Sequence, residues 1–298
     1  MALPIAVSVV VVGAALVALY GRGRVVTVAG FLVFGAMLSL YWGLIGAPDV
    51  GLAEAAIGTG VTGALFVHAA TALPDPPQPR SRSRWTVPVL LASGVLGGVM
   101  GVALVRAADA LDRAGLAAEV TEALPDTGVE HPVTGVLLNL RSYDTLLEIV
   151  VLLAAVAVAL ALVPRPSVQV TPPAVLDTLV RVTTPVLFLV AAWLLVAGSS
   201  RPGGAFQSGA VVAATLILLH ASGVRPLTLG PLTRMLLSAG LAAFLAVAVG
   251  GLIVSGDTWL LLRGDFAGTI ILVLEAALAV TIGFSLAMLY LATARGRA

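Results

Sequence analysis

The sequence predicts an all-α membrane protein, a polytopic bundle of about nine transmembrane helices with the N-terminus outside and the C-terminus inside. Three observations lead to this fold class. Hydrophobic residues make up 59% of the 298 residues and charged residues only 10%, whereas soluble domains carry about 25% charged residues. Apolar segments of transmembrane length recur along the chain, and the arginines gather on alternate loops. This composition excludes an ordinary soluble enzyme, a nucleic-acid-binding protein and a disordered chain.

Nine segments are apolar over about 20 residues, the length that a helix needs to cross the hydrocarbon core. They cover residues 3–20, 25–46, 51–73, 86–106, 143–163, 174–198, 203–220, 232–255 and 267–292. Helices are expected because lipid cannot satisfy backbone polar groups, and the segments are too long for barrel strands. The first segment lacks a basic start and a clear cleavage site, so we interpret it as a retained span and not a signal peptide.

The arginines set the predicted orientation. With the N-terminus outside, 11 of the 16 basic residues lie on or near the cytoplasmic side, as the positive-inside rule requires. These residues are Arg22, Arg24, Arg80, Arg82, Arg84, Arg165, Arg181, Arg225, Arg234, Arg295 and Arg297. The outer residues are Arg106, Arg113, Arg141, Arg201 and Arg263. The acidic loop 107–142 then faces outside, which is consistent with this orientation.

The chain contains no cysteine and no lysine. Disulfides, thiolate catalysis and cysteine-bound iron–sulfur clusters are therefore excluded. A titrating lysine is excluded as well, since arginine stays protonated. The sequence shows no soluble catalytic triad, no metal-ligand cluster and no glycine-rich phosphate loop followed by lysine. We therefore expect a protein that is not an enzyme and that holds no cofactor.

Two proline-rich segments divide the chain into three parts. Residues 74–85 are rich in proline and then alternate arginine with serine, and residues 164–173 contain four prolines. Segments of this composition act as stiff spacers. The nine spans show no convincing internal repeat, so the sequence gives little support to an inverted-repeat transporter.

Acidic side chains inside apolar spans are the main functional candidates, because each costs about 2.5–3.5 kcal/mol at the centre of the membrane. Asp49 follows Pro48 at a helix start, where the alternative to function is an N-cap. Glu54 lies a full turn deeper among glycines and alanines, and packing explains those small residues but not the carboxylate. His68 shares a helical face with Glu54 about 21 Å away, although an interfacial histidine is the simpler interpretation.

Three further acids lie in later spans. Asp144 and Glu148 share one helical face and repel each other unless one binds a proton or cation, or both pair with arginine. An ion pair with Arg141 is the simpler interpretation for Asp144 and fits Glu148 poorly. Glu275 lies about eight residues inside the last span, and a hydrogen bond that joins two helices is an equal alternative to function. All these acids fall in the predicted outer half of the membrane, which suits a half-channel for protons or small cations.

Three motifs resemble parts of one family. Residues 47–55, Ala-Pro-Asp-Val-Gly-Leu-Ala-Glu-Ala, resemble a pattern of MbhD subunits and of the MrpA subunits of Mrp-type sodium/proton antiporters. Residues 139–148, Asn-Leu-Arg-Ser-Tyr-Asp-Thr-Leu-Leu-Glu, are similar to a pattern of the adjoining MbhE-type segment. The third motif resembles one in the MrpB subunits. It is carried by Pro202, Gly203, Gly204, Phe206 and Gln207.

The resemblance implies an accessory membrane protein that fuses an MbhD-like segment (1–79), an MbhE-like segment (80–165) and an MrpB-like segment (166–298). It implies that the partners are the lipid bilayer and other membrane subunits, among them antiporter-like subunits with intramembrane lysines. It implies no nucleic-acid partner. It links Glu54, Asp144 and Glu148 to the path of Na+ or H+, the transported ions. Ala53, Ser142 and Leu147 replace a Thr and two Gly of the family patterns. A hydrogenase-related membrane arm and a purely structural scaffold remain alternative functions.

Overall fold

The computed structural model describes residues 2–72, 86–110, 115–162, 174–223, 230–255 and 260–295. Within these ranges the chain forms helices and turns and no strand. Eight helices are long and apolar enough to cross a membrane, and Ala205–Ala221 is a shorter apolar helix. The predicted all-α membrane bundle is confirmed. The proposed spacers, residues 74–85 and 164–173, lie outside the described residues.

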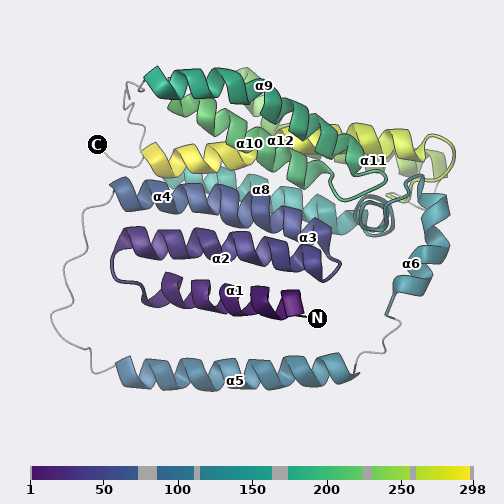
Figure 1. Cartoon of the computed structure of the whole chain (residues 1–298). Helices are drawn as coiled ribbons and strands as arrows, with labels where there is room; N and C mark the ends of the chain where they lie inside the picture. The colour runs from purple at the N-terminus through teal and green to yellow at the C-terminus, as the bar shows by residue number, and fades with distance from the viewer. Residues whose placement is uncertain are drawn as a thin grey trace. The chain divides into compact units, whose positions relative to one another are not determined.

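The helices follow the predicted spans closely, with one exception (Figure 1). Seven of the spanning helices are α1 (Ala2–Tyr20), α2 (Arg24–Leu44), α5 (Thr86–Ala110), α8 (Ser142–Leu162), α9 (Ala174–Ala197), α11 (Pro231–Ser255) and α12 (Ala267–Arg295), and the shorter apolar helix is α10 (Ala205–Ala221). The third span is not one continuous α-helix. It consists of α3 (Pro48–Ala53), a π-helical segment η1 (Glu54–Val61) and α4 (Thr62–Ala72).

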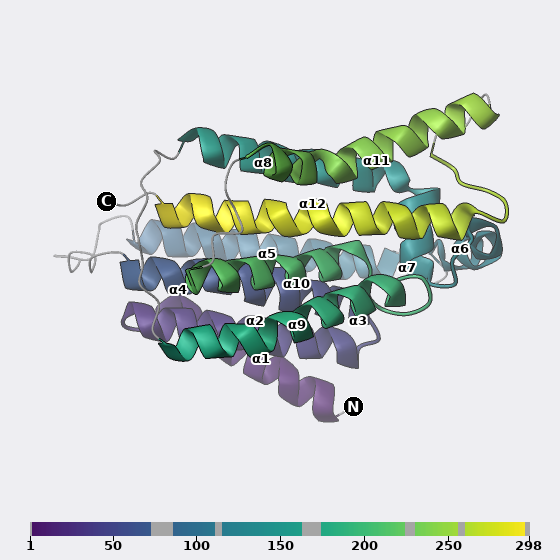
Figure 2. The ribbon, with the colours of Figure 1, turned by 90° about the horizontal axis from the view of Figure 1, so that it is seen from above.

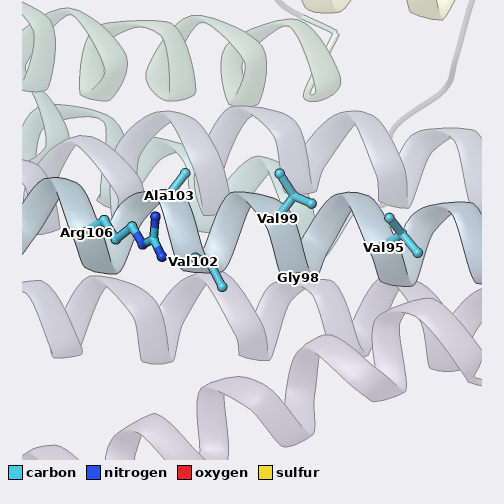
Figure 3. Close-up of a pocket in the computed structure, with 6 residues that line it drawn as sticks. All are labelled: Val95, Gly98, Val99, Val102, Ala103 and Arg106. Atoms are coloured by element: carbon cyan, nitrogen blue, oxygen red, sulfur yellow. The ribbon is translucent and has the colours of Figure 1, made fainter.

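The chain divides into two compact units. One contains Met1–Ala72 and Leu124–Ala298, and the other contains Leu73–Ala123. The second unit consists of α5 and the short helix α6 (Ala117–Ala123). A shallow hollow runs along α5 past Val95, Val99 and Arg106 (Figure 3). Since residues of a single helix line it, this hollow offers no built site.

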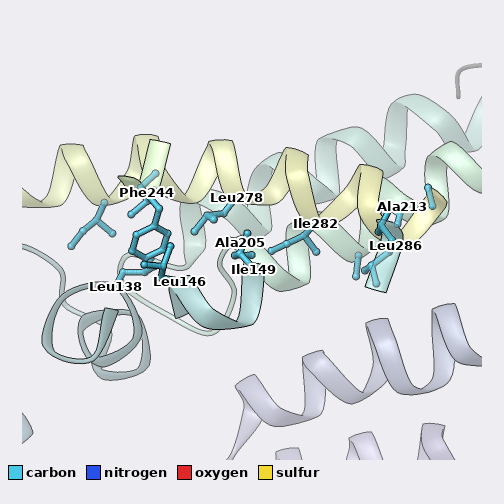
Figure 4. Packing of buried hydrophobic residues seen from close by; sticks show 14 of the residues in the cluster. Leu138, Leu146, Ile149, Ala205, Ala213, Phe244, Leu278, Ile282 and Leu286 are labelled. Atoms are coloured by element: carbon cyan, nitrogen blue, oxygen red, sulfur yellow. The ribbon is translucent and has the colours of Figure 1, made fainter. Parts of the chain in front are cut away.

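Helix α12 forms the centre of the larger unit. Its apolar stretch is 61% buried, against 6–22% for the other spans of that unit. It packs against α8, α9, α10 and α11, and it runs between these helices in the view from above (Figure 2). Its buried side chains Leu278 and Ile282 meet Ile149 and Phe244 in one apolar cluster (Figure 4).

Small residues allow the close approach of α10 and α12, as is usual where helices pack in lipid. A Cβ added to Gly209 of α10 would lie 2.8 Å from the Ile282 side chain and 2.9 Å from the Ala279 carbonyl oxygen. A polar contact joins α12 to α11, because the Thr281 hydroxyl accepts the Gly240 N–H at 2.7 Å and donates to the Leu236 carbonyl at 2.9 Å.

Candidate functional site

One end of the bundle is tied together by the irregular segment 124–140. This segment contains a 3-10 turn, the short helix α7 (Pro132–Gly135) and the π-helical turn η3 (Val136–Leu140). Its Asn139 side chain donates to the Leu262 carbonyl at 2.8 Å and accepts the Leu262 N–H at 2.9 Å. The Ser142 hydroxyl donates to the Leu260 carbonyl at 3.0 Å. The start of α8 therefore lies beside the loop that leads into α12.

The same segment holds the turn between α9 and α10. The backbone N–H groups of Glu130 and His131 both donate to the Ser199 carbonyl, at 2.9 and 3.0 Å. The Thr134 hydroxyl donates to the Gly198 carbonyl at 2.6 Å. These bonds place the start of α10 at the same end as the starts of α8 and α12.

Asp49 joins this end to the first part of the chain. Its Oδ2 lies 3.0 Å from Nε2 of His131, and its Oδ1 accepts the Gly203 N–H at 3.3 Å. The Gln207 amide donates to the Asp49 backbone carbonyl at 3.4 Å. The N-cap interpretation of Asp49 is wrong, because Ala47 occupies the N-cap position and no side chain caps α3. Asp49 instead cross-links the first and third sequence motifs through His131, Gly203 and Gln207.

Glu275 is buried beneath the α9–α10 turn. The residue is only 2% exposed, and its carboxylate accepts the backbone N–H of Ala205 at the start of α10. Its Oε2 has no hydrogen-bond partner among the described residues. A Cβ on Gly198 or Gly204 would lie 3.1 or 2.8 Å from Oε1 of Glu275, and Gly204 has a φ of +104°. These glycines therefore leave the space that the carboxylate occupies.

This arrangement supports part of the helix-joining interpretation of Glu275. The carboxylate satisfies one of the backbone N–H groups that every helix start leaves unpaired, and it lies where the helix dipole favours negative charge. One oxygen remains without a partner in a buried environment, which is rare for a purely structural contact. The geometry thus accounts for Oε1 and leaves Oε2 available for a ligand.

Glu54 begins the π-helical segment η1 and is half-buried. Its carboxylate lies over Gly58, one turn further on, where a Cβ would come 2.7 Å from Cδ of Glu54. It also approaches Gly35 of α2, where a Cβ would lie 3.3 Å from Oε1. Within the described ranges this carboxylate makes no hydrogen bond or ion pair. The prediction that Glu54 points toward protein or water and not toward lipid is consistent with these close glycines.

Asp144 and Glu148 lie on an exposed face of α8. Arg141 pairs with Asp144 at 2.5 Å, with 65% and 42% of the two side chains exposed. The ion-pair interpretation of Asp144 is therefore confirmed. Glu148 is exposed as well, and no hydrogen bond or ion pair holds it in the part of the chain that the structure describes. A carboxylate on an outward-facing surface of a transmembrane helix needs protein or water beside it.

His68 does not join the acids. It lies on α4, and its ring is 6.0 Å from the ring of Tyr290 on α12, measured between centroids. The structure thus brings Asp49, Gln207 and Gly203 together at one end, places Glu275 under the same turn, and leaves His68 further along the bundle. Pro202 lies in the α9–α10 turn, and Phe206 packs against the apolar cluster from the first turn of α10.

Sequence reasoning did not select two residues that the structure places at these sites. His131 lies outside every predicted span, so the cost of placing a charge in lipid did not mark it as a functional candidate. Its position directly before Pro132 at a helix start was the available signal. Thr59 was not selected either, because a threonine in an apolar span carries no charge that would single it out. No group of three or more acidic or histidine side chains suited to a metal ion occurs among the described residues.

Comparison with known proteins identifies two parts of the chain. Residues 9–75 match the MbhD family, which is described as a subunit of MBH, and residues 175–293 match a domain related to the MnhB subunit of Na+/H+ antiporters. No curated protein matches the chain at a significant level. Residues 76–174 lie between the two matched ranges, where the MbhE-like character and the three segment boundaries stay predictions.

A solved structure, that of the Mrp complex from Dietzia sp. DQ12-45-1b, has the same fold. It superposes with a TM-score of 0.76 at 24% sequence identity over 97% of this chain. The chain spans 34% of the length of the matched chain. Together with the apolar helices, these matches make the protein a multi-pass protein of the cell membrane. The chain therefore fuses an MbhD-family part with a part that belongs to the domain family related to the MnhB subunit of Na+/H+ antiporters.

Proposed function

We propose that the chain is an accessory subunit of a multisubunit monovalent cation/proton antiporter and that its intramembrane glutamates contribute to the ion path. The two family matches support the assembly, and the positions of the acids support the role. The transported ions are Na+ or H+, and the partners are other membrane subunits, including antiporter-like subunits with intramembrane lysines. The N-terminus lies outside and the C-terminus inside.

One observation carries this proposal: three glutamates lie at nearly one depth. The hydrogen bonds from segment 124–140 and from Asp49 place the starts of α3, α8, α10 and α12 at a common end. Glu54 and Glu148 follow the starts of α3 and α8 by six residues, and Glu275 follows the start of α12 by eight. At 1.5 Å per residue these depths are about 9, 9 and 12 Å.

Helix α10 connects two of these glutamates. It packs against η1, which carries Glu54, and against α12, which carries Glu275. Neither carboxylate has a basic partner within the described residues, and each has at least one oxygen without a hydrogen bond. A charged group kept in the membrane without a structural partner is typical of an ion or proton pathway. Glu148, exposed on α8, extends the same layer toward a neighbouring subunit.

Charge-neutralising variants test the proposal. Glu54→Gln and Glu148→Gln keep the size of the side chain, so we expect antiport to be lost while the subunits still co-purify. The measurement is the cation-dependent pH change in everted vesicles. Full activity in both variants would remove these residues from the path, whereas dissociation of the complex would favour a structural scaffold.

The MbhD match favours a second candidate, the membrane arm of a hydrogenase-related complex, because that family is described as a subunit of MBH. In such a complex the redox chemistry takes place on other chains, which fits a chain without cysteine. Iron–sulfur proteins that co-purify with the chain in mild detergent would support this candidate. Their absence, together with antiport by the purified complex, would exclude it.

A further inference from the structure

The π-helical segment η1 contains a buried hydroxyl group that nothing satisfies. Oγ1 of Thr59 is buried and has no hydrogen-bond partner. Threonine in an apolar helix usually donates to the carbonyl of the preceding turn, as Thr215 does to Val211 at 2.8 Å and Thr183 does to Leu179 at 2.8 Å. Buried polar atoms without a partner are rare, and a ligand or an ordered water is a common explanation for one.

Thr59 and Glu54 converge on one glycine of the neighbouring helix. A Cβ on Gly35 would overlap Oγ1 of Thr59 and lie 3.3 Å from Oε1 of Glu54. Both oxygens therefore lie close to the position that a Cβ on the buried Gly35 would take. The two oxygens do not bond to each other, because Oγ1 of Thr59 has no hydrogen-bond partner. The lack of a Cβ at Gly58 lets the Glu54 carboxylate lie against the helix at that position.

The π-helical register is what brings these two side chains to one face. In an α-helix, residues five apart are turned by about 500°, which leaves them about 140° from alignment. In a π-helix the backbone bonds join residues five apart, so residue 59 comes under residue 54. Segment η1 spans Glu54–Val61 and contains both residues. The irregular register therefore assembles a pair of oxygen ligands that a regular helix would separate.

The charge balance around η1 leaves this carboxylate uncompensated. The elements that pack on η1 are α2, α3, α4 and α10. The one Arg or Lys in these elements is Arg24, at the far start of α2. The other titratable side chains on them lie near helix ends, and they are Tyr41, Asp49, His68 and His220. Because no nearby basic side chain on these elements compensates its charge, the Glu54 carboxylate is suited to bind either a mobile cation or a proton.

We propose that Glu54 and Thr59, with the space left by Gly35, form a binding site for a monovalent metal cation. Carboxylate and hydroxyl oxygens are the ligands that hard cations prefer. Glu54 neutralises the charge of the cation, and Thr59 supplies a second, neutral oxygen. This inference deepens the proposed antiport function by naming where the cation binds.

The chain offers matched variants for the test. Thr59→Val removes the hydroxyl and keeps the shape, and Thr59→Ser keeps the hydroxyl. Gly35→Ala fills the space, whereas Gly43→Ala on the same helix adds a Cβ that meets nothing within 4 Å. If the site exists, cation binding should be impaired in Thr59→Val and Gly35→Ala. Thr59→Ser and Gly43→Ala should bind the cation like the wild type.

The experiment measures the protection of Glu54 by cations in the purified complex. A hydrophobic carbodiimide modifies protonated carboxyl groups in membranes, and mass spectrometry of the peptide containing Glu54 gives its rate. Sodium or potassium chloride should slow the reaction, while choline chloride at equal ionic strength should not. Thr59→Val and Gly35→Ala should raise the half-protecting concentration about tenfold, which corresponds to about 1.4 kcal/mol. Thr59→Ser and Gly43→Ala should stay within about threefold of the wild type.

Either of two results would overturn the site. One is equal protection by choline, and the other is wild-type protection in both Thr59→Val and Gly35→Ala. The apparent KM for the cation in vesicle transport is a second readout, expected to rise in the same two variants if carbodiimide does not reach Glu54. If the complex transports cations but the cations do not protect Glu54 from the carbodiimide, only the site is contradicted. If cations protect Glu54 but the complex transports no cation, only the antiport function is contradicted.

Discussion

Glu54 and Glu275 are both intramembrane glutamates of one chain, yet the fold holds them in opposite ways. Glu54 lies half-buried in a π-helical segment with no hydrogen bond, beside glycines of two helices. Glu275 is 2% exposed in a regular helix, with one oxygen fixed by the Ala205 N–H. The MbhD-like part thus presents an accessible acid, and the MnhB-like part a covered one.

The largest expected effect separates the two roles of Glu275. Glu275→Gln keeps an oxygen that accepts the Ala205 N–H, so the variant should fold and assemble yet lose antiport. Glu275→Ala should lose antiport and also leave that N–H unpaired, which costs about 1–3 kcal/mol of stability. Vesicle transport and thermal unfolding in detergent measure the two effects. Full transport by Glu275→Gln would reduce Glu275 to a helix-joining residue.

The glycine turn that covers Glu275 gives the next effect. Gly204 has a φ of +104°, and a Cβ there would lie 2.8 Å from Oε1 of Glu275. Gly204→Val combines backbone strain of about 1–3 kcal/mol with displacement of the carboxylate. We expect a lower melting temperature and strongly reduced antiport. Gly250→Ala in α11, where a Cβ meets nothing within 4 Å, is the control, and equal behaviour of the two variants would contradict the covering role.

The cross-link between the two parts gives a moderate effect on stability. His131→Ala removes the partner of a half-buried Asp49 carboxylate, and the loss of such a charged hydrogen bond costs about 1.5–3 kcal/mol. Asp49→Asn keeps an acceptor for the Gly203 N–H and should cost less. Thermal unfolding of the purified complex ranks these variants. A wild-type melting temperature for His131→Ala would show that the pair does not hold the two parts together.

The smallest effect concerns the exposed ion pair on α8. Arg141 and Asp144 are 65% and 42% exposed, and ion pairs at such positions contribute about 0–1 kcal/mol. Arg141→Gln should therefore leave the melting temperature nearly unchanged. A large drop in stability would show that this face of α8 is buried against another subunit in the assembly.

The helices were the easiest feature to predict, because a membrane span needs only length and apolar composition. The acids were predictable as well, since the cost of charge in lipid singles out Glu54, Glu148 and Glu275. The π-helical register of η1 was not predictable, because helix propensity describes a residue within its own helix and takes no account of a neighbouring helix such as the one that carries Gly35. The Asp49–His131 pair joins residues 82 positions apart, and no local pattern predicts such a contact. The N-cap interpretation of Asp49 failed because Pro48 takes the first helical position.

The orientation of the chain remains a prediction that is simple to check. The chain has no cysteine, so single cysteines introduced at Ala2 and Arg297 have no background. A membrane-impermeant maleimide should label the first from outside intact cells and the second only after the membrane is opened. The reverse pattern would invert the topology and move the three glutamates to the cytoplasmic half.

The most direct test of the ion-path role is cation-dependent proton movement in liposomes that contain the purified complex, with Glu54→Gln compared against the wild type. The account predicts that a sodium or potassium pulse changes the internal pH of wild-type liposomes and leaves that of the Glu54→Gln liposomes unchanged, with the same subunits present in both. Equal pH changes in the two preparations would contradict it.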